Sequence, residues 1–363
     1  MENKRSNAKS DLMGVSAAGV SSIAQKELSP LKRFINSSVF LVICIEIVLV
    51  AVFSVCSDGL FFSTDNLLNV GMNAAQMMIL AFGITFLMTA GFFDMSIGMN
   101  VIFSSVVAAK VFKFVAGTPE QITAGIYPNL ELAVIATIVT AIVVGILGGV
   151  MNGFFVTELH LPAFIATLAT MNIFQGIAFV ICNGAMETDI PRDFQTYFGH
   201  AKLFDVIPYP LILALIIGLI LHFIMKYTKF GLYVRALGSN SESARRGGID
   251  IKKYTYAVYI LMGALAAVAG LLDIARFATT NPNGHKTDSL LAIMAVVMGG
   301  TSLKGGIGSV SGTIIAALIP VTLQIGLIVI RVNTYYQLVV TGIFVVFAVY
   351  IDYCRNIKAP RNQ

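Results

Sequence analysis

Long apolar segments alternate with short polar segments along most of the chain. A bilayer core of about 30 Å needs around 20 apolar residues for one helical crossing. The pattern therefore predicts an all-α, polytopic membrane helix bundle with about ten transmembrane segments. The expected spans are residues 39–57, 70–90, 95–115, 130–156, 163–183, 208–226, 254–275, 287–300, 307–330 and 335–352.

Two of these ten segments fit a membrane span less well than the others. The segment 95–115 is polar for a span, since it contains Ser96, Asn100 and Lys110, and the segment 287–300 is short. A broken or re-entrant helix is tolerated at membrane depth only inside a protein bundle. Whether either segment crosses fully is left open by the sequence.

The polar segments carry an uneven charge that orients the spans. The segment 226–253 alone holds seven of the 24 Lys and Arg residues. With the N-terminus inside and ten spans, the inside segments hold 17 basic residues and the outside segments hold seven. Cytoplasmic loops are enriched in Lys and Arg, so both termini are expected inside. Residues 1–38 and 353–363 are then cytoplasmic tails that flank a transmembrane domain over 39–352.

The composition excludes an ordinary soluble protein. The 363 residues are 57% hydrophobic and only 12% charged, with a mean hydropathy of +0.83, whereas soluble domains are roughly 25% charged. The net charge of +5 does not indicate nucleic-acid binding, because basic residues in loops between spans report orientation. The four cysteines form no C-x-x-C pair, so neither a disulfide framework nor a zinc site is expected.

The sequence contains no recognisable catalytic motif. Its four histidines are far apart and lack metal-ligand spacing. The glycine-rich run 299–308 resembles a phosphate-binding loop superficially, but it lacks the G-x-x-x-x-G-K-[ST] order, and a tight turn between two spans explains it. We therefore expect no metal, no cofactor, no ATP site and no enzyme activity in this chain.

Neutral polar residues within the spans are candidates for a translocation pathway. Asn73 and Gln76 lie in the second span, and Asn172 and Gln175 lie in the fifth. Each pair is three residues apart and so shares one helix face. Amides that face a water-filled route can hydrogen-bond the hydroxyl groups of an uncharged solute. Interhelical hydrogen bonding is the alternative interpretation.

Few ionisable residues lie at or near span depth, where such groups are costly and often functional. They are Glu46, Asp94, Lys110, His222 and Asp273. Asp94 is a candidate pathway residue, and a helix N-cap is its alternative role. Snorkelling or capping at a span end is the expected role of Glu46 and Asp273. No chain of carboxylates and histidines follows one route, as a proton relay would require.

The basic loop 226–253 is the best candidate for contact with a soluble partner. Ser239 or Asn240 can cap a short helix, and Gly247 and Gly248 can end it. A short amphipathic helix that projects into the cytoplasm is a docking element. The alternative is a solvated loop whose charge serves topology alone.

Four stretches of the chain carry a resemblance to a known family. In order, they are AFGITFLMTAGFFDMSIG (81–98), LPAFIATLATMNIFQGIAF (161–179), ALGSNSESARRGGIDIKKYTYAVYILMGALAAVAGLL (236–272) and AVVMGGTSLKGGIGSVSGTIIAAL (295–318). In this order they resemble the permease subunits of bacterial sugar-importing ABC transporters, the ribose, galactose, xylose and autoinducer-2 type. The resemblance covers roughly residues 39–355. Phe92 and Phe93 depart from the Gly-Ile that the family usually has, and Ile307 replaces a common Arg.

The resemblance implies a bacterial inner-membrane importer made of several polypeptides. Two permease subunits, alike or different, would form the pore in the lipid, and cytoplasmic ABC ATPase subunits would bind ATP and Mg²⁺. A periplasmic or lipoprotein solute-binding protein would deliver the solute. Asp94 and Ser96 match the family's signature stretch. The residues that would contact the ATPase are Asn240, Glu242, Ala244, Arg245, Arg246, Gly247, Gly248 and Ile249.

Three other functions compete with import of a monosaccharide or a similar polyhydroxylated solute. A related ABC permease for nucleosides or branched-chain amino acids would look broadly similar, although a charged substrate favours fixed opposite charges in the pore. A stand-alone secondary carrier would need ion-coupling groups at the midplane, and the ionisable residues lie mostly near span ends. A membrane enzyme would need a catalytic cluster.

Overall fold

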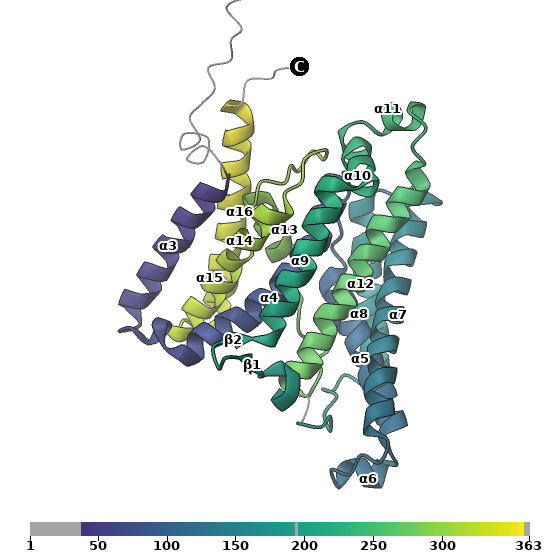
Figure 1. Ribbon diagram of the computed structural model, residues 1–363, viewed down its shortest axis with the longest axis vertical. Coiled ribbons are helices and arrows are strands. Elements are labelled where there is room, and N and C mark those ends of the chain that lie inside the picture. The colour runs from purple at the N-terminus through teal and green to yellow at the C-terminus, as the bar shows by residue number, and fades with distance from the viewer. Residues whose placement is uncertain (1–37, 193–194, 359–363) are drawn as a thin grey trace, which may run out of the picture.

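The computed structural model describes residues 38–192 and 195–358, which fold into a bundle of long helices joined by short connections (Figure 1). The expected N-terminal tail thus lies outside the described residues, apart from Ser38, as do residues 359–363. The first half comprises α3 (Ser38–Cys56), the 3₁₀ turn η1 (Leu60–Phe62), α4 (Thr64–Thr89), α5 (Ile97–Ala116), α6 (Pro119–Thr123), α7 (Leu130–Thr157) and α8 (Ala163–Cys182).

The second half begins with a helical turn and a two-stranded hairpin and continues as helices. The π-helical turn η2 (Gln195–Gly199) precedes the strands β1 (Lys202–Leu203) and β2 (Ile207–Pro208), which pair antiparallel with Leu203 opposite Ile207. The helices are α9 (Tyr209–Tyr227), α10 (Lys229–Ser239), α11 (Ser241–Arg246), α12 (Ile251–Phe277), α13 (Asp288–Met298), α14 (Val310–Ala316), α15 (Leu318–Val329) and α16 (Thr334–Lys358).

All ten predicted spans are helical, with ends that differ from the prediction by six residues or fewer. Within the described ranges, eight helices are long and apolar enough to cross a membrane, while α13 and the apolar part of α16 are shorter. The helix α16 continues past residue 352, so the expected C-terminal tail begins as helix. The polytopic all-α bundle is therefore confirmed.

The two weak segments have different outcomes. The helix α5 is complete. Its side chains of Asn100, Ser104 and Ser105 are buried in the bundle, where Asn100 Nδ2 donates to the Gly145 carbonyl at 3.2 Å, and Lys110 is paired with Glu187. The helix α13 has only 11 residues. A helix this short is stable at membrane depth when protein surrounds it, and most of α13 is buried.

The ninth span is interrupted near its middle. Ala317 separates α14 from α15, and Pro320 follows in the first turn of α15. Proline has no N–H to donate to the carbonyl four residues earlier, here that of Ala316. The loss of this hydrogen bond explains why the span is built from two helical pieces.

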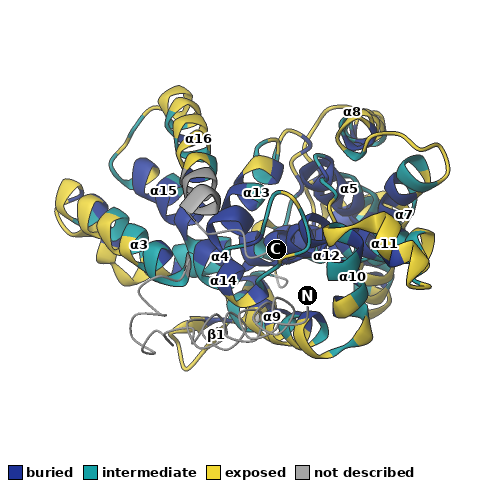
Figure 2. Cartoon of the chain, turned by 90° about the horizontal axis from the view of Figure 1, so that it is seen from above, coloured by how far each residue is buried: buried dark blue, intermediate teal, exposed yellow. Residues whose placement is uncertain are grey.

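The helices α4 and α12 form the centre of the bundle, and α3 lies at its edge (Figure 2). Most residues of α4 and α12 are buried, whereas α3 has many exposed apolar side chains, as expected of a helix in contact with lipid. Central helices are surrounded by protein on all sides, so they can carry polar groups that lipid would not tolerate.

Glycines on α7 let it pack closely against α12. A Cβ at Gly145 would lie 2.4 Å from the Gly263 carbonyl oxygen, and a Cβ at Gly149 would lie 2.2 Å from that of Tyr259. Small residues four apart permit such close helix contacts in membranes. The glycine repeat of the fourth span is therefore a seam within the subunit.

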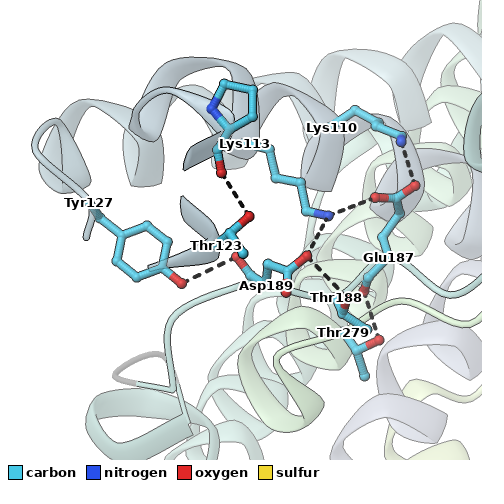
Figure 3. A network of polar contacts seen from close by, with 9 residues as sticks. Lys110, Lys113, Thr123, Tyr127, Glu187, Thr188, Asp189 and Thr279 are labelled. Atoms are coloured by element: carbon cyan, nitrogen blue, oxygen red, sulfur yellow. Dashed lines mark hydrogen bonds and ion pairs between the residues drawn. The ribbon is translucent and has the colours of Figure 1, made fainter. Parts of the chain in front are cut away.

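A polar network fixes the outer ends of α5 and α12 to the connection after α8 (Figure 3). Glu187, whose side chain is almost fully buried, pairs with Lys110 at 2.6 Å and with Lys113 at 3.1 Å. The Glu187 carbonyl accepts a hydrogen bond from Thr279 Oγ1 at 2.7 Å, and the Glu187 backbone forms an isolated bridge with Thr280. The network positions the chain segment that follows α12.

Candidate functional site

A polar cavity of about 480 Å³ lies inside the bundle, between α4, α12, α13 and α15. Asn73 and Gln76 line it from α4, and Gln324 lines it from α15. The cavity lies toward the C-terminal end of α12, whose N-terminal end directly follows the basic loop. With the basic loop inside, as the loop charges predict, this end of α12 is the outer one. The candidate pathway residues of the second span thus face a cavity.

A cluster of charged residues forms another wall of this cavity. Asp273 and Arg276 belong to the last turns of α12, His285 to the following loop and Asp288 to the start of α13. The His285 ring contacts Asp273 through Nε2 and Asp288 through Nδ1, the latter at 2.7 Å. The interpretation of Asp273 as a snorkelling or capping group is wrong, because its carboxylate is buried and paired with His285.

Arg276 is held against the amides of α4. Its guanidinium donates to Asn73 Oδ1 at 3.0 Å and to Asn69 Oδ1 at 2.6 Å, and it lies 4.7 Å from the centre of the Phe277 ring. Asn73 Nδ2 also donates to the Asn69 carbonyl at 2.7 Å. Arg276 therefore crosslinks the outer halves of α4 and α12.

The protonation of His285 is expected to make stability depend on pH. Burial alone lowers the pKa of His285, but the carboxylates of Asp273 and Asp288 outweigh it and raise that pKa well above 6.5. The stabilisation is then complete below about pH 6.5, where the unfolded chain is also protonated, and is lost as pH rises through the folded-state pKa.

The thermal midpoint of the detergent-solubilised protein should therefore fall as pH rises from about 6.5 through the raised folded-state pKa of His285. In a His285→Gln variant this slope should be flatter, and in a His200→Gln control, altered at an exposed residue, it should be unchanged. An equal slope in all three proteins would contradict the assignment.

Asp94 and Ser96 form a separate buried cluster at the start of α5. Asp94 Oδ1 accepts hydrogen bonds from Ser96 N at 2.7 Å and Ser96 Oγ at 2.6 Å. Asn152 Nδ2 of α7 donates to Asp94 Oδ2 at 3.2 Å, and Thr170 of α8 donates to Asn152 Oδ1 at 2.6 Å. Burial raises the pKa of Asp94 to about 6, while the bonds from Ser96 and Asn152 oppose that rise. The cluster joins α5, α7 and α8.

The structure places Asn172 and Gln175 away from the polar cavity. Asn172 is exposed on α8 and donates to the Leu168 carbonyl of its own helix at 2.9 Å, and Gln175 is half-buried. The six candidate pathway residues thus lie in three places: the cavity, the cluster at the start of α5 and the exposed face of α8.

The basic loop folds into the expected capped helix. Asn240 Oδ1 accepts a hydrogen bond from Ser243 N at 2.9 Å at the start of α11, and the helix ends at Gly247 and Gly248, the latter with φ of 83°. Ala244 is buried and Ile249 is half-buried, so these side chains fasten the helix to the bundle. The prediction of a capped helix is confirmed.

The helix α11 lies at one end of the bundle (Figure 1). The side chains of Arg245 and Arg246 are 70% and 79% exposed, and both pair with Glu242, at 2.9 and 3.1 Å. Exposed ion pairs contribute little to stability. These side chains are therefore free to exchange these contacts for contacts with a partner.

Three segments far apart in sequence meet beneath α11. The Gly306 N–H donates to the Thr89 carbonyl at 2.9 Å. A Cβ at Gly238 would lie 1.9 Å from the same oxygen, and a Cβ at Gly308 would lie 1.9 Å from Thr89 Oγ1. Only glycine fits here, so the end of α10, the end of α4 and the turn before α14 touch through backbone. We call this contact the glycine junction.

The sequence identified part of this site and missed the rest. Asp273 was among the ionisable residues at span depth, and Arg276 lies one helical turn later. His285 lies in a loop whose course the sequence does not specify, and Asp288 begins the helix that follows this loop. Gln324 could have been found by the same criterion as Asn73, since it too is an amide within an apolar span.

A bundle that crosses the membrane repeatedly, encloses a polar cavity and presents a capped basic helix belongs to the class of membrane transport subunits. The chain belongs to the family described as Branched-chain amino acid transport system / permease component, whose model matches residues 66–349. It is accordingly a multi-pass protein of the cytoplasmic membrane and a permease component of an importer.

Several curated relatives cover most of the chain. The ribose import permease protein RbsC of Escherichia coli K12 is 32% identical over 84% of this chain and 91% of its own. The D-allose transport system permease protein AlsC of the same strain is 32% identical over 84% and 88%. The xylose transport system permease protein XylH of Haemophilus influenzae is 27% identical over 88% and 97%. No solved structure matches the chain.

Proposed function

We propose that the chain is the permease subunit of an ABC importer for a monosaccharide or a similar polyhydroxylated solute. The family description names branched-chain amino acids, whereas the relatives that align over most of the chain are named for ribose, allose and xylose. The observation that carries the proposal is a cavity of amides and mutually paired charges in the same subunit as a projecting basic helix. Such a cavity suits uncharged hydroxyl groups.

In this proposal the energy comes from separate subunits. Cytoplasmic ABC ATPases bind ATP and Mg²⁺ and dock on Asn240–Ile249, where Arg245, Arg246 and Glu242 supply the polar contacts. A periplasmic or lipoprotein binding protein delivers the solute, and a second permease subunit, identical or homologous, completes the pore. The permease itself hydrolyses nothing.

The glycine junction gives the proposed route for the coupling motion. Closure of the ATPase dimer displaces α11, and α10 passes the displacement to Thr89 and to the turn at Gly306 through rigid backbone contacts. From there α4 continues to Asn73 and Gln76, and α14 and α15 continue to Gln324. The α4 side and the α15 side of the cavity are thus both connected to α11. Packed elements with discrete arrangements transmit such shifts.

The amides on α8 are expected to serve transport rather than assembly. An amide on a spanning helix is costly against lipid tails, so Asn172 and Gln175 are proposed to face the pore beside the second permease. Replacing either with leucine should lower uptake without lowering the amount of protein in the membrane. The control is Ile173→Leu on the same exposed surface. Normal uptake by both amide variants would make them packing groups.

The direct test of the proposed function is reconstitution with the co-expressed ATPase and binding protein in liposomes. ATP-dependent accumulation of ribose, galactose or xylose, with no accumulation of leucine, is the expected result. Accumulation of leucine alone, or accumulation driven by an ion gradient without ATP, would reject the proposal.

A further inference from the structure

The fixed charges of the polar cavity cancel within the protein. Asp273 and Asp288 contribute two negative charges, and Arg276 and protonated His285 contribute two positive charges. His285 bridges the two carboxylates. Arg276 is satisfied in part by the neutral oxygens of Asn69 and Asn73. The cavity therefore presents strong hydrogen-bonding groups without a net charge.

Hydrogen-bonding capacity is left over for a solute. A guanidinium has five N–H donors, and the hydrogen bonds of Arg276 to Asn69 and Asn73 use two of them. Gln76 Nε2 is buried without a hydrogen-bond partner among the described residues. Met77, Val321 and Phe277 supply apolar surface beside these groups. A cavity of about 480 Å³ with a few polar groups on apolar walls is typical of a small-molecule site.

Neutral and charged solutes would affect these pairs differently. Hydroxyl groups both donate and accept, so a sugar can bridge the carboxylates and the guanidinium while every existing ion pair stays intact. A zwitterion must instead displace His285 from a carboxylate or compete for Arg276, and an unpaired buried charge is strongly destabilising. Charge pairing thus discriminates against amino acids.

We propose that this cavity is a solute subsite of the permease that selects neutral, polyhydroxylated solutes. Arg276, Asp288 and Gln76 bind the hydroxyl groups, and His285 sets the charge balance. The proposal rests on the proposed function and adds that selection takes place within the permease as well as in the delivering protein.

A cysteine in the cavity wall reports both occupancy and charge. Gln324→Cys is introduced after replacement of Cys44, Cys56, Cys182 and Cys354 with alanine, and the purified transporter is labelled with methanethiosulfonate reagents that are neutral, cationic or anionic. Millimolar ribose, galactose or xylose should slow labelling by the neutral reagent severalfold, and leucine should leave the rate unchanged. Protection by leucine, or by no solute, would overturn the proposal.

Two variants, one that removes a positive charge and one that removes a negative charge, test the charge balance of the cavity. With His285→Gln the ratio of cationic to anionic labelling rates should rise about tenfold, because one buried positive charge is removed. With Asp288→Asn the ratio should fall by a similar factor. The His200→Gln control should not change it. Because a folding defect would alter both variants in the same direction, opposite shifts identify electrostatics, and an unchanged ratio in both would overturn the proposal.

The liposome assay separates this proposal from the one on which it rests. ATP-driven uptake of a sugar by a transporter whose cavity shows no protection would reject the subsite and leave the importer function intact. Failure to import any sugar, with leucine imported instead, would reject the importer function itself.

Discussion

Replacing Gly238 with alanine is expected to lower uptake about tenfold or more at an unchanged amount of protein in the membrane. The new Cβ would lie 1.9 Å from the Thr89 carbonyl oxygen and 2.7 Å from Gly306 N. Both are backbone atoms, so the glycine junction must separate. Overpacking of this kind costs about 1–3 kcal/mol, and about 1.4 kcal/mol already changes an equilibrium tenfold. Uptake by cells and quantitative membrane blots measure the effect.

The control for this prediction is Gly342→Ala, a helical glycine of α16 with open space around it. A rescue experiment makes the test specific. Gly308→Ala should also lose uptake, because its Cβ would lie 1.9 Å from Thr89 Oγ1, and adding Thr89→Ala should restore part of it by removing that oxygen. Full uptake by Gly238→Ala, or no rescue in the double variant, would show that the junction does not transmit the motion.

Reversing the charge of Arg245 and Arg246 is expected to abolish uptake while the protein remains inserted and folded. Both side chains are largely exposed and bind only Glu242 among the described residues, so their replacement should not alter the bundle. With glutamate at both positions, α11 carries three acidic residues on one face. The proposed ATPase surface is complementary to a basic helix, so it should repel this acidic face. Like charges that face each other across an interface suppress association.

The charge-matched control for this pair is Lys226→Glu with Lys229→Glu. These residues also lie in the segment 226–253, so both double variants remove the same number of basic residues from the segment that orients the spans. The control should keep most of its uptake. Equal loss in both double variants would mean that the loop acts through its total charge, and normal uptake by the variant with Arg245→Glu and Arg246→Glu would remove α11 from the coupling mechanism.

The spans were predictable because the bilayer imposes a length and an apolarity that few other structures share. Hydropathy located all ten, including α5, although its polar residues weakened the signal. The orientation, with both termini inside, stays a prediction from the charge of the loops. The ends of α4 and α16 were less certain, since both helices extend beyond the apolar core.

The candidate site was only partly predictable, because side-chain direction and loop course depend on packing. Asn73 and Asn172 gave the same signal in sequence, yet one faces the cavity and the other the exterior of the subunit. The link between Asp273 and Asp288 requires His285, which lies in a loop with no periodicity. The glycine junction unites the ends of α4 and α10 with the turn before α14, and the sequence predicted only that the glycine-rich run 299–308 is a tight turn.

The most direct test of α11 as the docking site of an ABC ATPase is purification of the tagged protein from mild detergent, with mass spectrometry of the proteins that accompany it. A cytoplasmic ABC ATPase should be recovered with the wild type and with the variant altered at Lys226 and Lys229, and it should be lost when Arg245 and Arg246 are replaced with glutamate. Recovery of this chain alone, together with ion-gradient-driven uptake in liposomes, would contradict this docking and favour a stand-alone carrier.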